Sequence, residues 1–186
     1  LAEHLSRLQA SADYFDIDFN RENVSNYLQS LAKDFPKAPQ RVRLLLHNDG
    51  QLQGTFARLD KSQALPLRIR LAAEPIDVQN VTLYHKTTQR QLYESCLAAG
   101  KDVDEVVLWN QQGEVTECCT ANLVAEICGK LVTPPVSSGL LPGTYREFLL
   151  KRGVLTEQTL SADDLRNASR IYLINAVRKW RRATLA

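Results

Sequence analysis

The sequence is short of sulfur-containing residues: its 186 residues include four cysteines and no methionine. Two of the cysteines, Cys118 and Cys119, are chain neighbours, and no C-x-x-C or H-x-x-x-H pair is present. The usual spacing of zinc ligands is therefore missing, and so is the cysteine pattern of a disulfide-stabilised secreted domain. We expect no metal, no disulfide framework and a reducing, cytoplasmic setting.

Long apolar runs, a signal peptide and a strong net charge are also missing. A membrane-spanning helix needs about 20 mostly apolar residues in a row, and no such run occurs. The formal net charge of +2 is too small to indicate a nucleic acid or an anionic membrane as partner. The basic segment "VRKWRRA" is interpreted as a solvated face. Walker, G-x-G-x-x-G and G-x-S-x-G motifs are absent, so neither a nucleotide loop nor a serine hydrolase is predicted.

What is present is the periodicity of an α+β protein. In the first part of the chain, apolar residues spaced by three and four predict helices, and alternating residues predict strands. A turn at Asn48-Asp49-Gly50 predicts a hairpin. The expected elements are helices over 1–15 and 21–35, a hairpin over 41–60 and a strand over 65–73. Because the sequence begins inside a helix and has no methionine, we expect it to be a piece of a longer chain.

A polar, proline-containing segment at 74–82 is predicted to link two domains. We expect a small N-terminal domain over 1–73, incomplete at its start, and a larger C-terminal domain over 83–186. Hairpins and helices in both parts indicate an α+β fold and not a doubly wound parallel sheet. The elements expected in the larger domain are a strand at 83–86, a helix over 88–99, a hairpin over 104–117, two strands within 121–135, a helix over 143–152 and a strand over 169–177.

Lys86, in "LYHKTTQR", follows a short apolar run and precedes the helix that Thr88 and Gln91 are predicted to cap. A lysine amine becomes nucleophilic toward aldehydes when burial or nearby positive charge lowers its pKa. The N-terminal end of a helix carries partial positive charge, so this junction could supply both influences. Taken alone, the pattern more often marks an ordinary lysine at the end of a strand.

Three other segments carry candidate groups. Glu117 ends a predicted strand in a small-residue turn, where a carboxylate could face a pyridine-type nitrogen; a solvated glutamate is the ordinary alternative. Thr144 and Tyr145 fall in the first turn of a predicted helix, whose N–H groups suit a phosphate. Arg7, on the opening helix, has a planar guanidinium that matches phosphate oxygens, although most such arginines are solvated.

The order of these segments is more informative than any one of them. "HLSRL", "HKTTQRQLYE", "EVTECCTANLV", "LLPGTYR" and "LINAVRKW" together resemble the fold type IV pyridoxal-phosphate enzymes. That family includes branched-chain and D-amino-acid aminotransferases and 4-amino-4-deoxychorismate lyase. "VTECCTAN" and "NAVRKW" are most similar to the lyase branch, and "HKTTQR" with "LLPGTYR" to the lyase domain of fused para-aminobenzoate synthases. The resemblance covers the chain from His4 to its end and implies a two-domain, D-amino-acid aminotransferase-like α+β fold.

Carried over position by position, the resemblance assigns roles around pyridoxal 5′-phosphate. Lys86 would bond covalently to this cofactor and then act as the catalytic base. Glu117 would partner the ring nitrogen of the cofactor, which sustains its ability to accept electrons. Arg7 and the backbone around Thr144 and Tyr145 would hold the phosphate. The remaining cofactor-binding positions, at the end of the late strand, are Asn175 and Ala176.

The resemblance implies a 4-amino-4-deoxychorismate lyase that releases pyruvate and para-aminobenzoate, a folate precursor. An aminotransferase acting on a D- or branched-chain amino acid stays open, because the same lysine serves both reactions. An inactive structural domain of a larger synthase is a third reading. The resemblance also implies a small-molecule substrate and a homodimer, either fused to or working with aminodeoxychorismate synthase. No nucleic acid and no membrane are expected as partners.

Overall fold

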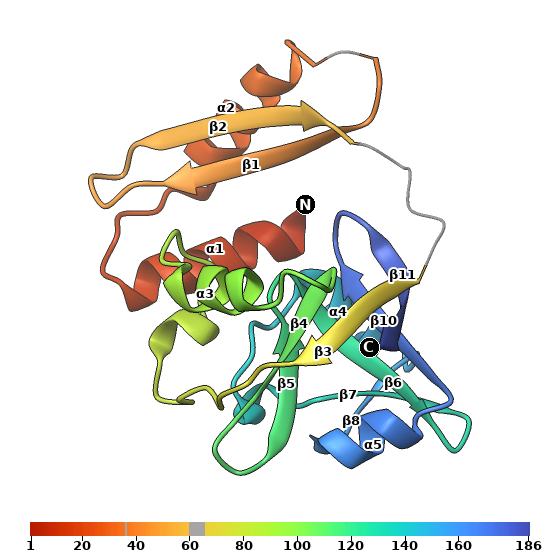
Figure 1. Ribbon diagram of the computed structural model, residues 1–186. Helices are drawn as coiled ribbons and strands as arrows, with labels where there is room; N and C mark the ends of the chain where they lie inside the picture. The colour runs from red at the N-terminus through yellow and green to blue at the C-terminus, as the bar shows by residue number, and fades with distance from the viewer. Residues whose placement is uncertain (36, 60–65) are drawn as a thin grey trace. The chain divides into compact units, whose positions relative to one another are not determined.

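The computed structural model describes residues 1–35, 37–59 and 66–186, which fall into two compact units, Leu1–Gln63 and Ala64–Ala186 (Figure 1). In these ranges no helix combines the length and the apolar character that crossing a bilayer requires. All four cysteines carry free thiols, as expected from their spacing.

The first unit is a two-stranded antiparallel sheet accompanied by two helices. Asn20 caps the second helix by accepting a 2.9 Å hydrogen bond from the Asn23 backbone N–H. Gly54 allows this helix to approach the sheet, because a Cβ there would lie 2.7 Å from a methyl group of Leu31. The Gly54 N–H donates to the Tyr27 hydroxyl at 2.8 Å. The predicted helices and hairpin are thus confirmed as α1 (Ala2–Tyr14), α2 (Arg21–Ala32), β1 (Gln40–Leu46) and β2 (Leu52–Arg58).

The second unit is built on a nine-stranded sheet. Its described elements, in chain order, are β3 (Leu67–Leu71), η1 (Val81–Leu83), α3 (Gln91–Ala99), β4 (Glu105–Trp109), β5 (Glu114–Cys118), β6 (Ala121–Ile127), β7 (Lys130–Thr133), η2 (Val136–Ser138), α4 (Thr144–Lys151), β8 (Thr156–Glu157), β9 (Leu160–Ser161), α5 (Ala162–Asn167), β10 (Arg170–Asn175) and β11 (Lys179–Leu185). The predicted hairpin at 104–117 is β4–β5, and Gly113, with φ of 79°, supplies the left-handed conformation of its turn.

The sheet closes into a barrel because β5 pairs with β6 as well as with β4. The order β6-β10-β11-β3-β4-β5 therefore returns to β6. Strand β3 runs parallel to both of its neighbours, β11 and β4. The predicted domain boundary at residue 73 is therefore wrong, since the alternating segment Leu67–Leu71 finds its partners in the barrel and belongs to the second unit.

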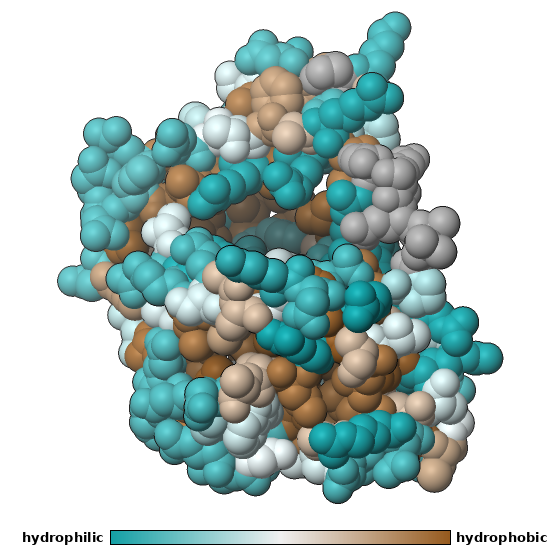
Figure 2. Space-filling view, viewed as in Figure 1, coloured by the Kyte–Doolittle hydropathy of each residue, from teal (hydrophilic) through white to brown (hydrophobic). Residues whose placement is uncertain are grey.

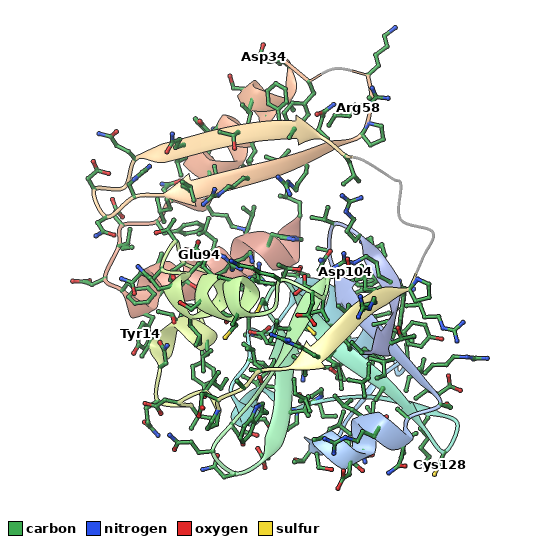
Figure 3. The ribbon with its side chains drawn as sticks, in the orientation of Figure 1. Tyr14, Asp34, Arg58, Glu94, Asp104 and Cys128 are labelled. Atoms are coloured by element: carbon green, nitrogen blue, oxygen red, sulfur yellow. The ribbon has the colours of Figure 1, made fainter. Side chains whose placement is uncertain are left out.

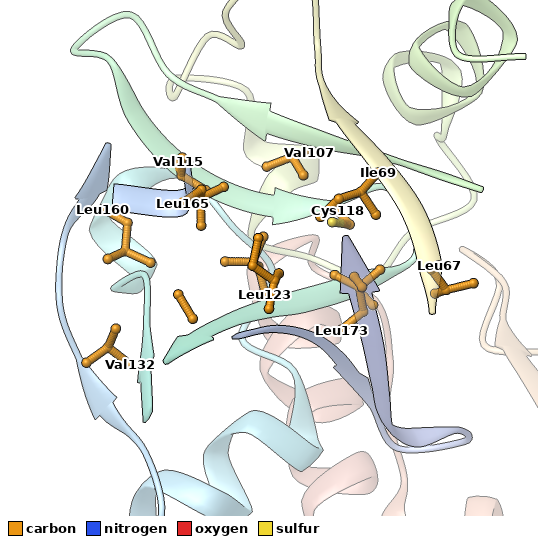
Figure 4. Close-up of a cluster of buried hydrophobic side chains, with 14 residues drawn as sticks. Leu67, Ile69, Val107, Val115, Cys118, Leu123, Val132, Leu160, Leu165 and Leu173 are labelled. Carbon is orange, nitrogen blue, oxygen red and sulfur yellow. The ribbon is translucent and has the colours of Figure 1, made fainter. Parts of the chain in front are cut away.

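Side chains alternate between the inside and the outside of the barrel. Val107, Cys118, Leu123 and Leu173 belong to the inner cluster (Figure 4). Chain neighbours point outward, so that one outer cluster packs against α3 and another against α4. Hydrophilic side chains cover most of the visible surface of this unit, and apolar ones show between β3 and α5 (Figure 2). Since each outer cluster packs against a different helix, α3 and α4 cover separate parts of the outer face of the barrel.

The segment around Lys86 differs from its prediction. Residues 83–86 do not form a strand, because the Asn80 side chain accepts hydrogen bonds from the Thr82 N–H (3.1 Å) and hydroxyl (2.7 Å) and starts the 3-10 turn η1. Helix α3 begins at Gln91, with Arg90 as its N-cap, so the predicted capping box does not form. The basic segment "VRKWRRA" lies largely in strand β11, which pairs with β10 and β3.

Candidate active site

Lys86 lies in the loop between η1 and α3 and lines a pocket of the second unit. The pocket is also lined by Thr82, His85, Thr87, Gln89, Arg90, Tyr93 and Leu141. Lys86 is exposed, so the burial expected from a strand end is absent. Positive charge is supplied by Arg90, which is the N-cap of α3 and so lies at the positive end of that helix. Lys86 and Arg90 both line the pocket, and its described lining includes no Asp or Glu, so the pocket favours anions.

Glu117 is buried behind this pocket and is held by three donors. The Tyr93 hydroxyl donates to Oε1 at 2.9 Å, and the Leu141 backbone N–H donates to the same oxygen at 3.2 Å. The Asn122 side-chain N–H lies 3.3 Å from Oε2. Burial raises the pKa of Glu117 to about 8, against the opposing effects of the Leu141 and Tyr93 hydrogen bonds and of the positive charges on Lys86 and Arg90. Tyr93 lines the pocket and bonds to Glu117, so it connects the lysine side of the site with the buried acid.

The β5–β6 hairpin accounts for the position of Glu117. Cys118 pairs with Ala121 and Glu117 with Asn122 across a tight turn. Because Cys118 points into the barrel, its neighbour Glu117 points outward. Asn122 also donates to the Leu141 carbonyl oxygen at 2.9 Å. The hairpin is thereby tied to the loop that leads into α4.

Thr144 and Tyr145 begin α4, as predicted. The N-cap residue is Gly143, which has no side chain with which to cap the helix. A Cβ at Gly143 would lie 2.0 Å from Asn122 Oδ1, so glycine permits the close approach of this helix end to β6. Thr144 is buried, and the Tyr145 ring lies 4.4 Å from the Lys179 amine. Asn122 therefore connects the buried acid with the end of α4 that suits a phosphate.

Asn175 ends β10 beside the same hairpin. Its side chain donates to the Thr120 carbonyl oxygen at 3.3 Å and accepts from the Arg178 backbone N–H at 2.7 Å. Ala176 follows in the turn between β10 and β11. Asn175 thus contacts the turn of the hairpin that carries Glu117, within the second unit. Arg7 lies on α1 in the first unit, and its place at the phosphate stays a prediction from the resemblance.

Sequence reasoning missed Arg90, Tyr93, Asn122 and Leu141. The sequence did contain a signal for Asn122. In a hairpin with a two-residue turn between β5 and β6, position 117 pairs with position 122. Tyr93 and Leu141 are each 24 residues from Glu117 in the chain, and no local pattern brings them together. Arg90 donates to the Cys119 carbonyl oxygen at 2.9 Å and lies over the Tyr93 ring at 4.8 Å.

Comparison with known proteins places this arrangement in a family. A Schizosaccharomyces pombe protein, provisionally named an aminodeoxychorismate lyase, is 30% identical over an alignment of length 188 that covers 96% of this chain and 80% of that protein. The structure of a provisionally assigned amino-acid aminotransferase from Mesorhizobium loti has a TM-score of 0.90 and 33% identity, over all of this chain and 91% of the other.

A provisionally assigned 4-amino-4-deoxychorismate lyase from Legionella pneumophila shares the fold, with a TM-score of 0.87 and 22% identity over 99% of this chain and 76% of the other. The α+β architecture is therefore that of the fold type IV enzymes. The profile of the class IV aminotransferases matches residues 1–186. The chain belongs to the class IV aminotransferase family of pyridoxal-phosphate-dependent enzymes.

Proposed function

We propose that the chain is a 4-amino-4-deoxychorismate lyase, which splits aminodeoxychorismate into pyruvate and para-aminobenzoate. The observation that carries the proposal is the connection of the Lys86 pocket to the buried Glu117 through Tyr93. Pyridoxal-phosphate chemistry needs an amine that can be displaced and an acid at the ring nitrogen, and this part of the second unit offers both. The 30% identity with the S. pombe protein favours the lyase branch.

The residues present fit pyridoxal phosphate. Glu117 is a buried carboxyl group whose pKa is raised to about 8, so a cationic partner would stabilise its charged form. A protonated pyridine nitrogen is such a partner. The anion-favouring pocket and the N-terminal end of α4 suit the phosphate. Thr144, Tyr145, Asn175 and Ala176 are proposed to line the bound cofactor, and Arg7 to contact its phosphate.

The proposed reaction divides its tasks among a few side chains. Bound pyridoxal phosphate supplies an electron sink for the bond broken at the amine-bearing carbon of the substrate. Lys86 Nζ would hold the cofactor and, once the substrate amine is bound in its place, would accept the proton from that carbon. Glu117 keeps the ring nitrogen protonated through a carboxylate oxygen. Breaking the ether C–O bond would release the side chain as enolpyruvate, which takes up a proton and becomes pyruvate. The ring that is left is aromatic, which makes the cleavage favourable.

An aminotransferase is the second candidate, and a specific observation favours it. The M. loti protein, an aminotransferase by its provisional assignment, matches the whole chain at 33% identity. Lys86 would serve that reaction as well. It would return the proton to the cofactor, whereas in the lyase the pyruvate unit is eliminated. The two reactions differ in their products. Under either proposal we expect a homodimer in the cytoplasm. If the chain is the lyase, we also expect it to take part in folate synthesis together with aminodeoxychorismate synthase.

Product analysis with a lysine variant tests the proposal. The protein loaded with pyridoxal phosphate should convert aminodeoxychorismate into equal amounts of pyruvate and para-aminobenzoate. Lys86→Ala should lose at least about 100-fold in this rate, because the general base is gone. Lys101→Ala, which changes an exposed lysine beyond the other end of α3, is the matched control and should keep full activity. Keto-acid exchange between amino acids without para-aminobenzoate would favour the aminotransferase, and an active Lys86→Ala would contradict both.

A further inference from the structure

We propose that Tyr93 is a positioning residue, which holds one oxygen of the Glu117 carboxylate so that the other oxygen is presented to the ring nitrogen of the cofactor. The inference rests on the proposed function, because it takes Glu117 as the partner of that nitrogen. It deepens the proposal by naming the group that sets the orientation of the acid.

The contacts of the two carboxylate oxygens are unequal. Oε1 accepts hydrogen bonds from the Tyr93 hydroxyl at 2.9 Å and the Leu141 N–H at 3.2 Å. A carboxylate oxygen has about two acceptor directions, so Oε1 is filled. Within the described ranges, Oε2 receives one contact, from Asn122 at 3.3 Å, which is long for a hydrogen bond of this kind. Oε2 is therefore the oxygen with acceptor capacity for a protonated nitrogen.

Tyr93 is itself held rigidly. It is 6% exposed and packs in the outer cluster between α3 and the barrel. The Arg90 guanidinium lies over its ring at 4.8 Å, and a hydrogen bond to the Cys119 carbonyl oxygen fixes that arginine. Burial and the neighbouring Glu117 raise the pKa of Tyr93 above its ordinary value. The phenol therefore keeps its proton and acts as a donor toward Oε1.

Removing the hydroxyl should alter Glu117 and leave the packing in place. Tyr93→Phe keeps the ring and its contact with Arg90 but leaves Oε1 with the Leu141 N–H alone. A hydrogen bond to a carboxylate stabilises its charged form, so its loss raises the pKa of Glu117. Because a charge-assisted hydrogen bond is among the strong ones, we expect an upward shift of about one pH unit.

Tyr84→Phe is the matched control. The Tyr84 hydroxyl is also partly buried in the outer cluster, and it donates to the Val78 carbonyl oxygen at 2.9 Å. Tyr84→Phe therefore removes one tyrosine hydroxyl, as Tyr93→Phe does, but leaves the contacts of Glu117 unchanged. We would titrate Glu117 in the cofactor-free proteins by infrared spectroscopy with ¹³C-labelled glutamate, and assign its band by its loss in Glu117→Gln.

The same proteins are then loaded with pyridoxal phosphate. Borohydride reduction should fix the cofactor on Lys86 in wild type, Tyr93→Phe and Tyr84→Phe, as read by mass spectrometry. The pH dependence of the cofactor absorbance should shift only in Tyr93→Phe. A wild-type protein that is not labelled at Lys86 would overturn the proposed function and, with it, the role of Oε2. If Lys86 is labelled in wild type but Glu117 titrates identically in cofactor-free Tyr93→Phe and wild type, the positioning role alone would be overturned.

Discussion

Glu117 is an acidic side chain that water hardly reaches, and burial governs its ionisation. Its pKa rises from 4.5 to about 8, chiefly through desolvation. Between these values the folded protein keeps a proton that the unfolded chain releases, so the contribution of Glu117 to stability falls as the pH rises through this range. Above about pH 8 the folded protein carries the full cost of the buried charge. Keeping Glu117 therefore lowers the free energy of unfolding of the cofactor-free protein as the pH rises.

Replacing Glu117 with glutamine removes this cost. In the cofactor-free protein, Glu117→Gln should gain stability relative to wild type as the pH rises from 5 to 8, because the amide has no proton to lose. The difference should be smallest at pH 5, the low end of this range. Thermal unfolding of both proteins across this range measures the difference in stability.

In the protein loaded with pyridoxal phosphate, Glu117→Gln should slow turnover, since the ring nitrogen loses its anionic partner. Lys86 should still be labelled by borohydride in this variant.

Glu94→Gln is the control for this pH dependence. Glu94 lies on the exposed side of α3 (Figure 3), on the same helix as Tyr93 and without its burial. Its substitution should leave the pH dependence of unfolding as in wild type. A stability difference between Glu117→Gln and wild type that stays constant from pH 5 to 8 would contradict the burial argument.

At the scale of elements, the contact between β6 and the start of α4 has no room for one more methyl group. Gly143 lies against Asn122, which also bonds to Leu141 and approaches Glu117. One small residue thus sets the distance between the helix end and the hairpin that carries the acid.

Gly143→Ala should weaken cofactor binding more than it weakens the fold. The backbone of Gly143, with φ of −67°, accepts alanine without strain, but the new Cβ would displace Asn122. We expect the dissociation constant for pyridoxal phosphate to rise at least about tenfold, equal to about 1.4 kcal/mol, as measured by absorbance titration. Gly153→Ala, past the other end of α4, meets no atom within 4 Å but has φ of 67°. It should lower the melting temperature and leave cofactor affinity unchanged.

Elements with strong local signals were predictable from the sequence, and elements fixed by distant contacts were not. The turn at Asn48-Asp49-Gly50 and the hairpin over 104–117 have local signals, and both were predicted correctly. The segment before Lys86 has the apolar content of a strand, yet Asn80 folds it into a 3-10 turn. Helix α3 starts late because Arg90 is held by Cys119 and Tyr93, which a capping pattern cannot show.

Over the whole molecule, closure of the barrel is what gathers the site. Leu67 pairs with Ala183, and Val107 with Leu71 and Cys118. Periodicity indicates that a strand exists but not which strand it joins. The domain boundary was therefore misplaced, and β11 was read as a solvated face. The roles proposed for Lys86, Glu117 and Thr144 came from the order of motifs, because the strand pairings of this unit have no local signature.

Substitution of Arg7 tests whether the first unit as well as the second contributes to cofactor binding. It is assigned to the phosphate by resemblance and lies on α1, in the first unit. A guanidinium–phosphate pair is worth roughly 1.5–3 kcal/mol, so Arg7→Gln should raise the dissociation constant for pyridoxal phosphate by about 10- to 100-fold. The fraction of Lys86 labelled at saturating cofactor should not change. Arg41→Gln, at an exposed position of β1, is the control and should bind as wild type does. Unchanged affinity in Arg7→Gln would confine the phosphate contacts to the second unit, with the start of α4 as their centre.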